Sequence, residues 1–244
     1  MHYRSLQEDL AEEEIKAVKK HVSFDGKDVL EIGCGDGRIT RKYWSVPKFL
    51  AAIDPDNEVL TEASKSLPES LSKDVKFQVG KAEKLDFTKD SFDVVFFTWS
   101  LCCVQNPDRS LREAWRVLRP KGLLVNLMPD VEPSIEVGVL RSLGGKDVTR
   151  PFSADAYKAL IRVMKDGMFA PIKEERIFIK VELDSIEDFV AWLPSSTGPF
   201  NEEEFASIGK KSIEKMKKFA ESLKSDHGLA LGDVLSLISA HKLS

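Results

Sequence analysis

One short stretch constrains the fold of this chain most: VLEIGCGDGRIT, residues Val29–Thr40, in which Gly33, Gly35 and Gly37 occupy every second position after an apolar run. A continuous apolar run is typical of a strand buried on both faces of a sheet. Glycines directly after such a strand permit a tight turn and let the backbone approach a ligand, because no Cβ stands in the way. The stretch therefore predicts a strand followed by a nucleotide-binding loop.

The spacing of the glycines decides between kinds of nucleotide. A dinucleotide-binding loop has the pattern G-x-G-x-x-G, in which the third glycine allows the helix to pack closely on the strand. If Gly33 and Gly35 are the first two glycines of that pattern, Arg38 stands at the third position. This departure argues against a nicotinamide or flavin cofactor.

Strands and helices are expected to alternate along the first half of the chain. The expected strands are 28–32, 49–54, 75–80, 92–98 and 122–128, and the expected helices are 5–21, 36–44, 57–66 and 108–118. Strands separated by helical crossovers form a parallel sheet with right-handed connections. The pattern therefore predicts an α/β fold with a mostly parallel sheet.

The regular alternation of strands and helices ends after Met128. The pattern predicts an irregular excursion at 130–152, a helix at 153–167, a sixth strand at 176–183, helices at 185–193 and 202–225, and a seventh strand at 233–242. Because residues 184–230 stand between two strands of one sheet, we expect them to form a helical cap. We expect residues 1–244 to form a single domain.

Composition excludes some classes of protein. The 244 residues carry a formal net charge of −4, which disfavours a general electrostatic grip on nucleic acid. The N-terminal residues are charged, and no apolar run reaches the length of a membrane span. Three cysteines, two of them adjacent, do not form a disulfide framework. We therefore expect a soluble, cytoplasmic protein.

The adjacent Cys102 and Cys103 raise the question of a metal site. A structural metal site needs about four ligands with a recognisable spacing. Neither cysteine has a histidine or a further cysteine near it in the sequence. We interpret the pair as buried or half-buried thiols and expect no metal.

Two motifs carry a resemblance to a known family. The first is Glu31-x-Gly33-x-Gly35-x-Gly37, and the second is SFDVVFFTWSLCCVQNPDRSLREAWRVLRPKGLLV, residues 91–125. Together they resemble the class I S-adenosylmethionine-dependent methyltransferases, in particular the type 11, ubiquinone/menaquinone methyltransferase-like family, and the resemblance is strong over residues 27–128. It implies a Rossmann-like seven-stranded sheet of order 3-2-1-4-5-7-6, with strand seven antiparallel and helices on both faces.

The resemblance also implies a set of cofactor-binding residues. Asp54 ends the second strand, 19 residues beyond Gly35, where an acid accepts hydrogen bonds from ribose hydroxyls. Lys81 stands where the family usually has the aspartate that contacts the adenine amino group, while Ala82 keeps a backbone contact. The full set is Glu31, Gly33, Cys34, Gly35, Gly37, Asp54, Pro55, Lys81, Ala82, Glu83, Thr98 and Trp99.

The function implied is transfer of a methyl group from S-adenosylmethionine, with S-adenosylhomocysteine as product, to a small-molecule acceptor. Collinear positioning of acceptor, methyl group and sulfur is the main demand of this displacement, and no general base is identified. Residues 1–24 are expected to cover the cofactor, and the candidate acceptor-binding residues are Tyr3, Trp99, Trp192 and Phe200.

Three alternatives stay open: a methyltransferase acting on protein or RNA, a non-catalytic S-adenosylmethionine-binding subunit, and a nicotinamide oxidoreductase. The exit of the fourth strand reads Thr-Trp-Ser-Leu, unlike the N/D-P-P-Y/F of base- or glutamine-modifying amino-methyltransferases. That difference argues against a nucleic-acid substrate. The accepting atom (O, N, C or S) and the oligomeric state are not determined by the sequence.

Overall fold

The computed structural model describes residues 3–194, 199–225 and 228–243. Contacts between Cα atoms divide the chain into two compact units. The sheet unit comprises Ala11–Pro129, Phe152–Ile177 and Ser236–Ser244, and the helical unit comprises Met1–Leu10, Asp130–Pro151 and Phe178–Leu235.

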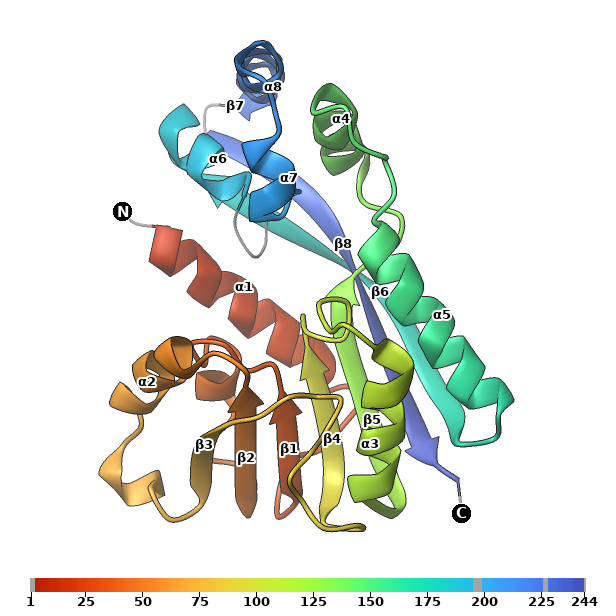
Figure 1. Cartoon of the computed structure of the whole chain (residues 1–244). Coiled ribbons are helices and arrows are strands. Elements are labelled where there is room, and N and C mark those ends of the chain that lie inside the picture. The colour runs from red at the N-terminus through yellow and green to blue at the C-terminus, as the bar shows by residue number, and fades with distance from the viewer. Residues whose placement is uncertain (1–2, 195–198, 226–227, 244) are drawn as a thin grey trace. The chain divides into compact units, whose positions relative to one another are not determined.

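Within the described residues, eight strands form one sheet of order β3-β2-β1-β4-β5-β8-β6, and the short β7 pairs with β8. The strands are β1 Asp28–Ile32, β2 Phe49–Asp54, β3 Val75–Val79, β4 Phe92–Thr98, β5 Leu118–Pro129, β6 Phe169–Leu183, β7 Lys224–Ser225 and β8 Gly228–Lys242. Strands β1 to β5 are parallel to one another, and β8 runs in the opposite direction (Figure 1). The predicted order is confirmed, with β8 in the place of the predicted seventh strand.

The apolar character of the central strands explains why they are parallel and buried. The side chains of β4 are buried from Val94 to Thr98, as expected for a strand covered on both faces. In the register of the sheet, Ile32 pairs with Ile53 of β2 on one side and with Phe97 of β4 on the other. The carboxyl ends of β1, β2 and β4 therefore meet at one edge.

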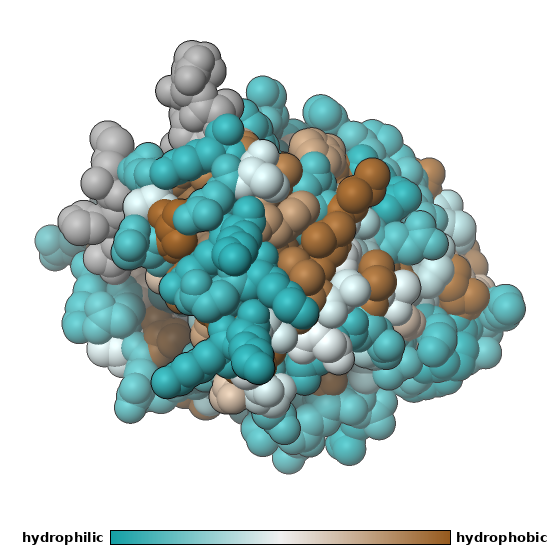
Figure 2. Space-filling model, turned by 90° about the horizontal axis from the view of Figure 1, so that it is seen from above, coloured by the Kyte–Doolittle hydropathy of each residue, from teal (hydrophilic) through white to brown (hydrophobic). Residues whose placement is uncertain are grey.

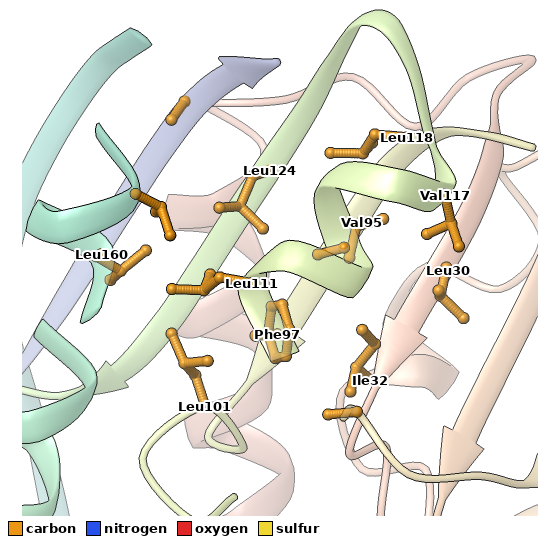
Figure 3. Close-up of a cluster of buried hydrophobic side chains, with 14 of the residues drawn as sticks. Leu30, Ile32, Val95, Phe97, Leu101, Leu111, Val117, Leu118, Leu124 and Leu160 are labelled. Atoms are coloured by element: carbon orange, nitrogen blue, oxygen red, sulfur yellow. The ribbon is translucent and has the colours of Figure 1, made fainter. Parts of the chain in front are cut away.

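Helix α3, Pro107–Val117, covers one face of these strands. The Asn106 side chain caps its first turn by accepting the N–H of Arg109 at 3.0 Å, and Pro107 needs no hydrogen-bond acceptor there. Figure 3 shows Leu111 and Val117 of this helix facing Val95 and Phe97 of β4. The same cluster takes in Leu160 from α5, Pro151–Lys165, so one apolar core supports the sheet unit.

Two expected helices differ from the structure. Residues 36–44 were expected to be helical, but they form turns with a 3₁₀ helix at Thr40–Lys42. Gly37 has a φ of +81°, outside the α-helical region, and the bonds that follow, such as that from the Lys42 N–H to the Ile39 carbonyl at 2.9 Å, close shorter turns. The expected helix at 202–225 is two helices, α7 Glu202–Ala206 and α8 Lys210–Ser222, with Gly209 between them.

The helical unit contains α4 Ile135–Leu143 and α6 Ile186–Trp192 besides α7 and α8. Helix α4 lies in the segment predicted to be irregular, and the Ser134 hydroxyl caps it by accepting the N–H of Val137. The buried guanidinium of Arg141 joins α4 to α7 by donating to Glu204. Ile135 stands 85% exposed, and Figure 2 shows apolar side chains of this kind among the hydrophilic ones on the face seen from above.

The remaining helices are α1 Tyr3–Val18 and α2 Asn57–Lys65. None of the helices in the described ranges combines the length and the apolar character needed to cross a bilayer.

Candidate cofactor site

A cavity of about 430 Å³ opens at the edge where the carboxyl ends of β1, β2 and β4 meet. An open α/β sheet binds its ligands at this edge. Seven of the predicted cofactor residues line the cavity: Gly33, Asp54, Pro55, Lys81, Ala82, Glu83 and Trp99. Six lining residues were not predicted: Ile32, Gly80, Ser100, Cys103, Val104 and Gln105.

No side chain fits at position 33, because the residue that follows β4 and Trp99 occupies the space a Cβ would take. The φ of Gly33 is +75°, and a Cβ at this position would overlap the Cβ of Ser100. Ser100 is held there because its hydroxyl donates to the carbonyl of Ile32. The glycine therefore lets the ends of β1 and β4 close against each other at the floor of the cavity.

Asp54 connects the end of β2 to the glycine loop. Its Oδ2 accepts the N–H of Gly35 at 2.9 Å, and its Oδ1 accepts the N–H of Asp56 at 3.0 Å. Each carboxylate oxygen has two lone pairs, so both atoms retain the capacity to accept from ribose hydroxyls. Asp54 lies in the cavity wall with its carboxylate already oriented by the backbone.

Glu31 is fully buried and does not line the cavity. Thr40 and Tyr43 each donate to its Oε2 at 2.8 Å, and Thr98 donates to its Oε1 at 2.9 Å. Burial raises the pKa of this carboxyl although the three hydroxyl donors stabilise its charged form. In the structure Glu31 and Thr98 therefore hold the glycine loop and β4 together from inside the protein.

The other glycine-loop candidates also lie outside the cavity wall. Cys34 is buried beside Ala52 and Leu60, and burial strongly raises the pKa of its thiol. Gly35 and Gly37 are not among the lining residues. Of the loop itself, only Gly33 faces the cavity in the structure.

The segment after β3 also forms part of the cavity wall. Glu83 Oε1 accepts the backbone N–H of Gln105 at 2.9 Å and of Asn106 at 3.3 Å. Gly80 donates its N–H to the carbonyl of Asp54 at 3.0 Å. Glu83 is therefore engaged in holding the segment after β4, while the side chain of Lys81 is exposed.

Trp99 joins the cavity to α1 through a residue that was not predicted. Its indole Nε1 donates to Glu14 Oε1 at 3.1 Å, and Arg38 Nη1 lies 2.8 Å from Glu14 Oε2. Glu14 is fully buried, and burial raises its pKa although Arg38 and the indole stabilise the charge. Arg38, which stands in the third glycine position of a dinucleotide loop, thus pairs with the N-terminal helix.

The sequence contains a signal for Glu14. Leu10, Ala11, Glu14 and Val18 follow helical spacing and are all buried, so a carboxylate stands on the apolar stripe of α1. A buried carboxylate requires a partner. Its partner Arg38 lies far from Glu14 in the sequence, and this separation hides the pairing.

Replacing Trp99 by phenylalanine should lower the free energy of unfolding by about 1–2 kcal/mol, because Glu14 Oε1 loses its indole donor inside the protein. Urea denaturation followed by circular dichroism measures this loss. The matched control is Trp115→Phe, whose indole donates to the carbonyl of Leu243 at 3.3 Å in an exposed setting. If the two variants lose equal free energy of unfolding, the buried bond to Glu14 contributes no more stability than the exposed bond of Trp115.

Two predicted acceptor-binding residues lie in the helical unit. Trp192 and Phe200 are 1% and 2% exposed, and their nearest rings are Phe189 at 6.3 Å and Phe205 at 6.5 Å. The side chain of Tyr3 lies outside the described side chains. The part of these three residues in acceptor binding stays a prediction.

No three His, Cys, Asp or Glu side chains gather as a metal ion would require in the part of the chain that the structure describes.

Comparison with known proteins gives three findings. Residues 30–126 match the family described as a methyltransferase domain. A ubiquinone/menaquinone biosynthesis C-methyltransferase of Rickettsia bellii is 28% identical over 169 residues, which are 63% of this chain and 66% of that protein. A phthiotriol/phenolphthiotriol dimycocerosates methyltransferase of Mycobacterium ulcerans is 35% identical over 121 residues, 48% of this chain and 42% of that protein.

A solved structure agrees in fold. The YcgJ protein of Bacillus subtilis superposes with a TM-score of 0.63 at 18% identity, and the match covers 100% of both chains. The curated relatives are matched over less than two thirds of their own length. The matched segment carries the glycine loop, Asp54 and Trp99. Over residues 30–126 the chain is therefore similar to the methyltransferase-domain family, and the comparisons together support a class I S-adenosylmethionine-dependent methyltransferase.

Proposed function

We propose that this protein binds S-adenosylmethionine in the cavity at the carboxyl ends of β1, β2 and β4 and transfers its methyl group to a small-molecule acceptor. The observation that carries the proposal is the convergence of Gly33, Asp54 and Trp99 on that one cavity. They come from three different strand ends, and each has the chemistry expected for a different part of the cofactor.

The residues that line the cavity fit this cofactor. Asp54 offers carboxylate oxygens to ribose hydroxyls, and Pro55 and Ala82 supply apolar surface beside it for an adenine ring. Trp99 lies at the β4 end, beside the glycine loop. S-adenosylmethionine, when bound, supplies a methyl group on a sulfonium, which leaves as a neutral thioether.

The protein's main contribution is positioning. Holding acceptor, methyl group and sulfur in line converts an encounter between two molecules into a step within one complex. Trp99 is suited to this task because its backbone N–H donates to Leu127 at 2.7 Å and its indole is bonded to Glu14. Of the described lining residues, the two acids, Asp54 and Glu83, already bond to backbone N–H groups. We therefore assign neither as a general base.

The proposal of a small-molecule acceptor is based on the names of two relatives and on the net charge of this chain. The two curated relatives are named for biosynthesis of ubiquinone or menaquinone and for phthiotriol dimycocerosates. The net charge of −4 disfavours nucleic acid. A small-molecule acceptor is the proposal that agrees with both.

Isothermal titration calorimetry with S-adenosylmethionine and with NAD tests the first half of the proposal. We expect binding of S-adenosylmethionine and none of NAD. Absence of S-adenosylmethionine binding would overturn the proposal. Transfer of a labelled methyl group to a pool of small metabolites, and none to protein or RNA, tests the second half; label in protein or RNA would favour that alternative instead.

Asp54→Ala should weaken S-adenosylmethionine binding by about 1–3 kcal/mol, or about 5- to 150-fold, because the ribose hydroxyls lose a charged acceptor. Calorimetry measures the change. The matched control is Asp56→Ala, which removes the cap that accepts the N–H of Glu58 at 2.7 Å but lies outside the cavity wall. We expect this control to lose stability and keep its affinity. Unchanged affinity in Asp54→Ala would refute the role given to Asp54.

A further inference from the structure

The three cysteines of the chain differ sharply in access. Cys34 and Cys102 are buried, whereas Cys103 is exposed, and none of them forms a disulfide in the described part of the chain. Burial strongly raises the pKa of Cys34 and so keeps that thiol protonated and inert. Of the three thiols, only that of Cys103 is accessible to a reagent in solution.

Cys103 is also the one cysteine that lines the proposed cofactor cavity, among the described residues. It follows the exit of β4, where its N–H donates to the carbonyl of Ser100 at 2.9 Å. Trp99, Ser100 and Val104 line the cavity beside it. A group attached to this sulfur would therefore stand in the cavity or its mouth.

The neighbouring thiol activates Cys103. The two Sγ atoms lie 3.8 Å apart, and both thiols lie near the carbonyl of Trp99. When Cys103 is ionised, Cys102 can donate its S–H to the Cys103 sulfur, and this bond lowers the pKa of Cys103 to about 7. A thiol with a pKa near neutral pH is the best attacking group in disulfide exchange.

We propose that the Cys102–Cys103 pair is a thiol–disulfide exchange site, at which Cys103 forms a mixed disulfide with a small disulfide such as glutathione disulfide and thereby excludes the cofactor. The exclusion rests on the proposed function, whereas the exchange itself does not. The Cys103 thiolate attacks one sulfur of glutathione disulfide and forms a new S–S bond. The old S–S bond breaks, its electron pair leaves on the other sulfur, and that glutathione thiolate takes a proton from water.

The geometry stops the reaction at the mixed disulfide. A direct bond between Cys102 and Cys103 would have to bring the two sulfurs from 3.8 Å to about 2.05 Å. The Cα atoms of adjacent residues are about 3.8 Å apart, below the usual range of about 4.4–6.8 Å for a disulfide. Cys102 therefore acts as hydrogen-bond donor to the attacking sulfur, and free thiols reverse the modification.

The experiment treats the purified full chain with glutathione disulfide at pH 7 and maps the modified peptide by mass spectrometry. We expect one glutathionyl group on Cys103, none on Cys34 or Cys102, and none in Cys103→Ser. Modification of Cys34 or Cys102 instead, or no modification at all, would overturn the proposal.

Two variants of Cys102 separate activation from mere exposure. In Cys102→Ala the donor is lost while the burial that raises the pKa of Cys103 remains, so the pKa of Cys103 rises and the reaction at pH 7 should slow at least about threefold, after allowing for the higher nucleophilicity of the more basic thiolate. Cys102→Ser keeps a donor and should react at close to the original rate. Equal rates in both variants would show that hydrogen-bond donation by Cys102 does not activate Cys103.

Calorimetry then compares the unmodified and glutathionylated chains. We expect S-adenosylmethionine to bind the unmodified chain, to fail to bind the modified chain, and to bind again after reduction with dithiothreitol. Full binding by the modified chain would overturn the exclusion. Modification of Cys103 in a chain that binds no S-adenosylmethionine in either state would instead overturn the proposed function and leave the exchange site standing.

Discussion

Glu31→Ala should lower the free energy of unfolding by about 3–5 kcal/mol, because three buried hydroxyl groups lose their acceptor at once. Thr40, Tyr43 and Thr98 all donate to this one carboxylate, and none of the four residues is open to solvent that could replace it. Urea denaturation measures the loss. A decrease below about 1 kcal/mol would show that the hydroxyls find other partners and that Glu31 is not the centre of this network.

Glu31→Gln is the matched control for Glu31→Ala. The amide oxygen can still accept from Thr40 and Tyr43, and the amide nitrogen can donate to Thr98, because a hydroxyl both donates and accepts. We therefore expect Glu31→Gln to remain within about 1.5 kcal/mol of the original protein. An equal loss in both variants would mean that the charge, not the hydrogen-bond geometry, is what matters.

The original protein and Glu31→Gln should also differ in how their stability depends on pH, and the sign of that difference can be worked out. Burial raises the pKa of Glu31 in the folded protein, so the folded state holds this proton to a higher pH than the unfolded chain does. The stabilisation from this proton is complete below the unfolded pKa of about 4.3 and is lost as pH rises through the folded pKa. Glu31→Gln lacks this loss, so its stability relative to the original protein should increase with pH above about 4.3. A constant difference would contradict the raised pKa.

The sheet could be predicted closely from the sequence because its central strands are continuous apolar runs. The bounds of β1, β2 and β4 agree with the predicted ranges at both ends. Helix α3 was also predicted to within one residue, since its start and its apolar face are encoded locally. The local pattern misled at 36–44, because Gly37 has a φ of +81° that interrupts the expected helix at its start.

The site could be predicted only in part, because motif residues and lining residues follow different rules. Gly33, Asp54 and Trp99 stand at strand ends, where the register of the sheet places them together. Cys103 and Gln105 line the cavity because Glu83 binds the backbone of Gln105 from 22 residues away. Such pairings between distant loops leave no periodic trace in a sequence. Glu31 belongs to the same motif as Gly33, but it lies inside β1, which is covered on both faces, whereas Gly33 follows the end of the strand.

Gly33→Ala should destabilise the protein by about 3–5 kcal/mol, whereas Gly35→Ala should cost only about 1–2 kcal/mol. Both positions have a positive φ, +75° and +54°, so both variants bear the strain of a left-handed backbone. Only at Gly33 would the new methyl group overlap Ser100, while no atom lies within 4 Å of the Cβ position at Gly35. The difference between the two variants therefore isolates the contact that closes β1 against β4.

Cofactor affinity gives the second measurement on these two variants. Ser100 can yield only by giving up its bond to the Ile32 carbonyl, which would move the cavity floor next to Trp99. We therefore expect Gly33→Ala to lose S-adenosylmethionine binding in calorimetry even at temperatures where it remains folded by circular dichroism. Gly35→Ala keeps the floor intact and should bind more tightly than Gly33→Ala. If the two variants were equal in stability and affinity, the backbone conformation alone, and not the approach of β4, would explain why glycine stands at position 33.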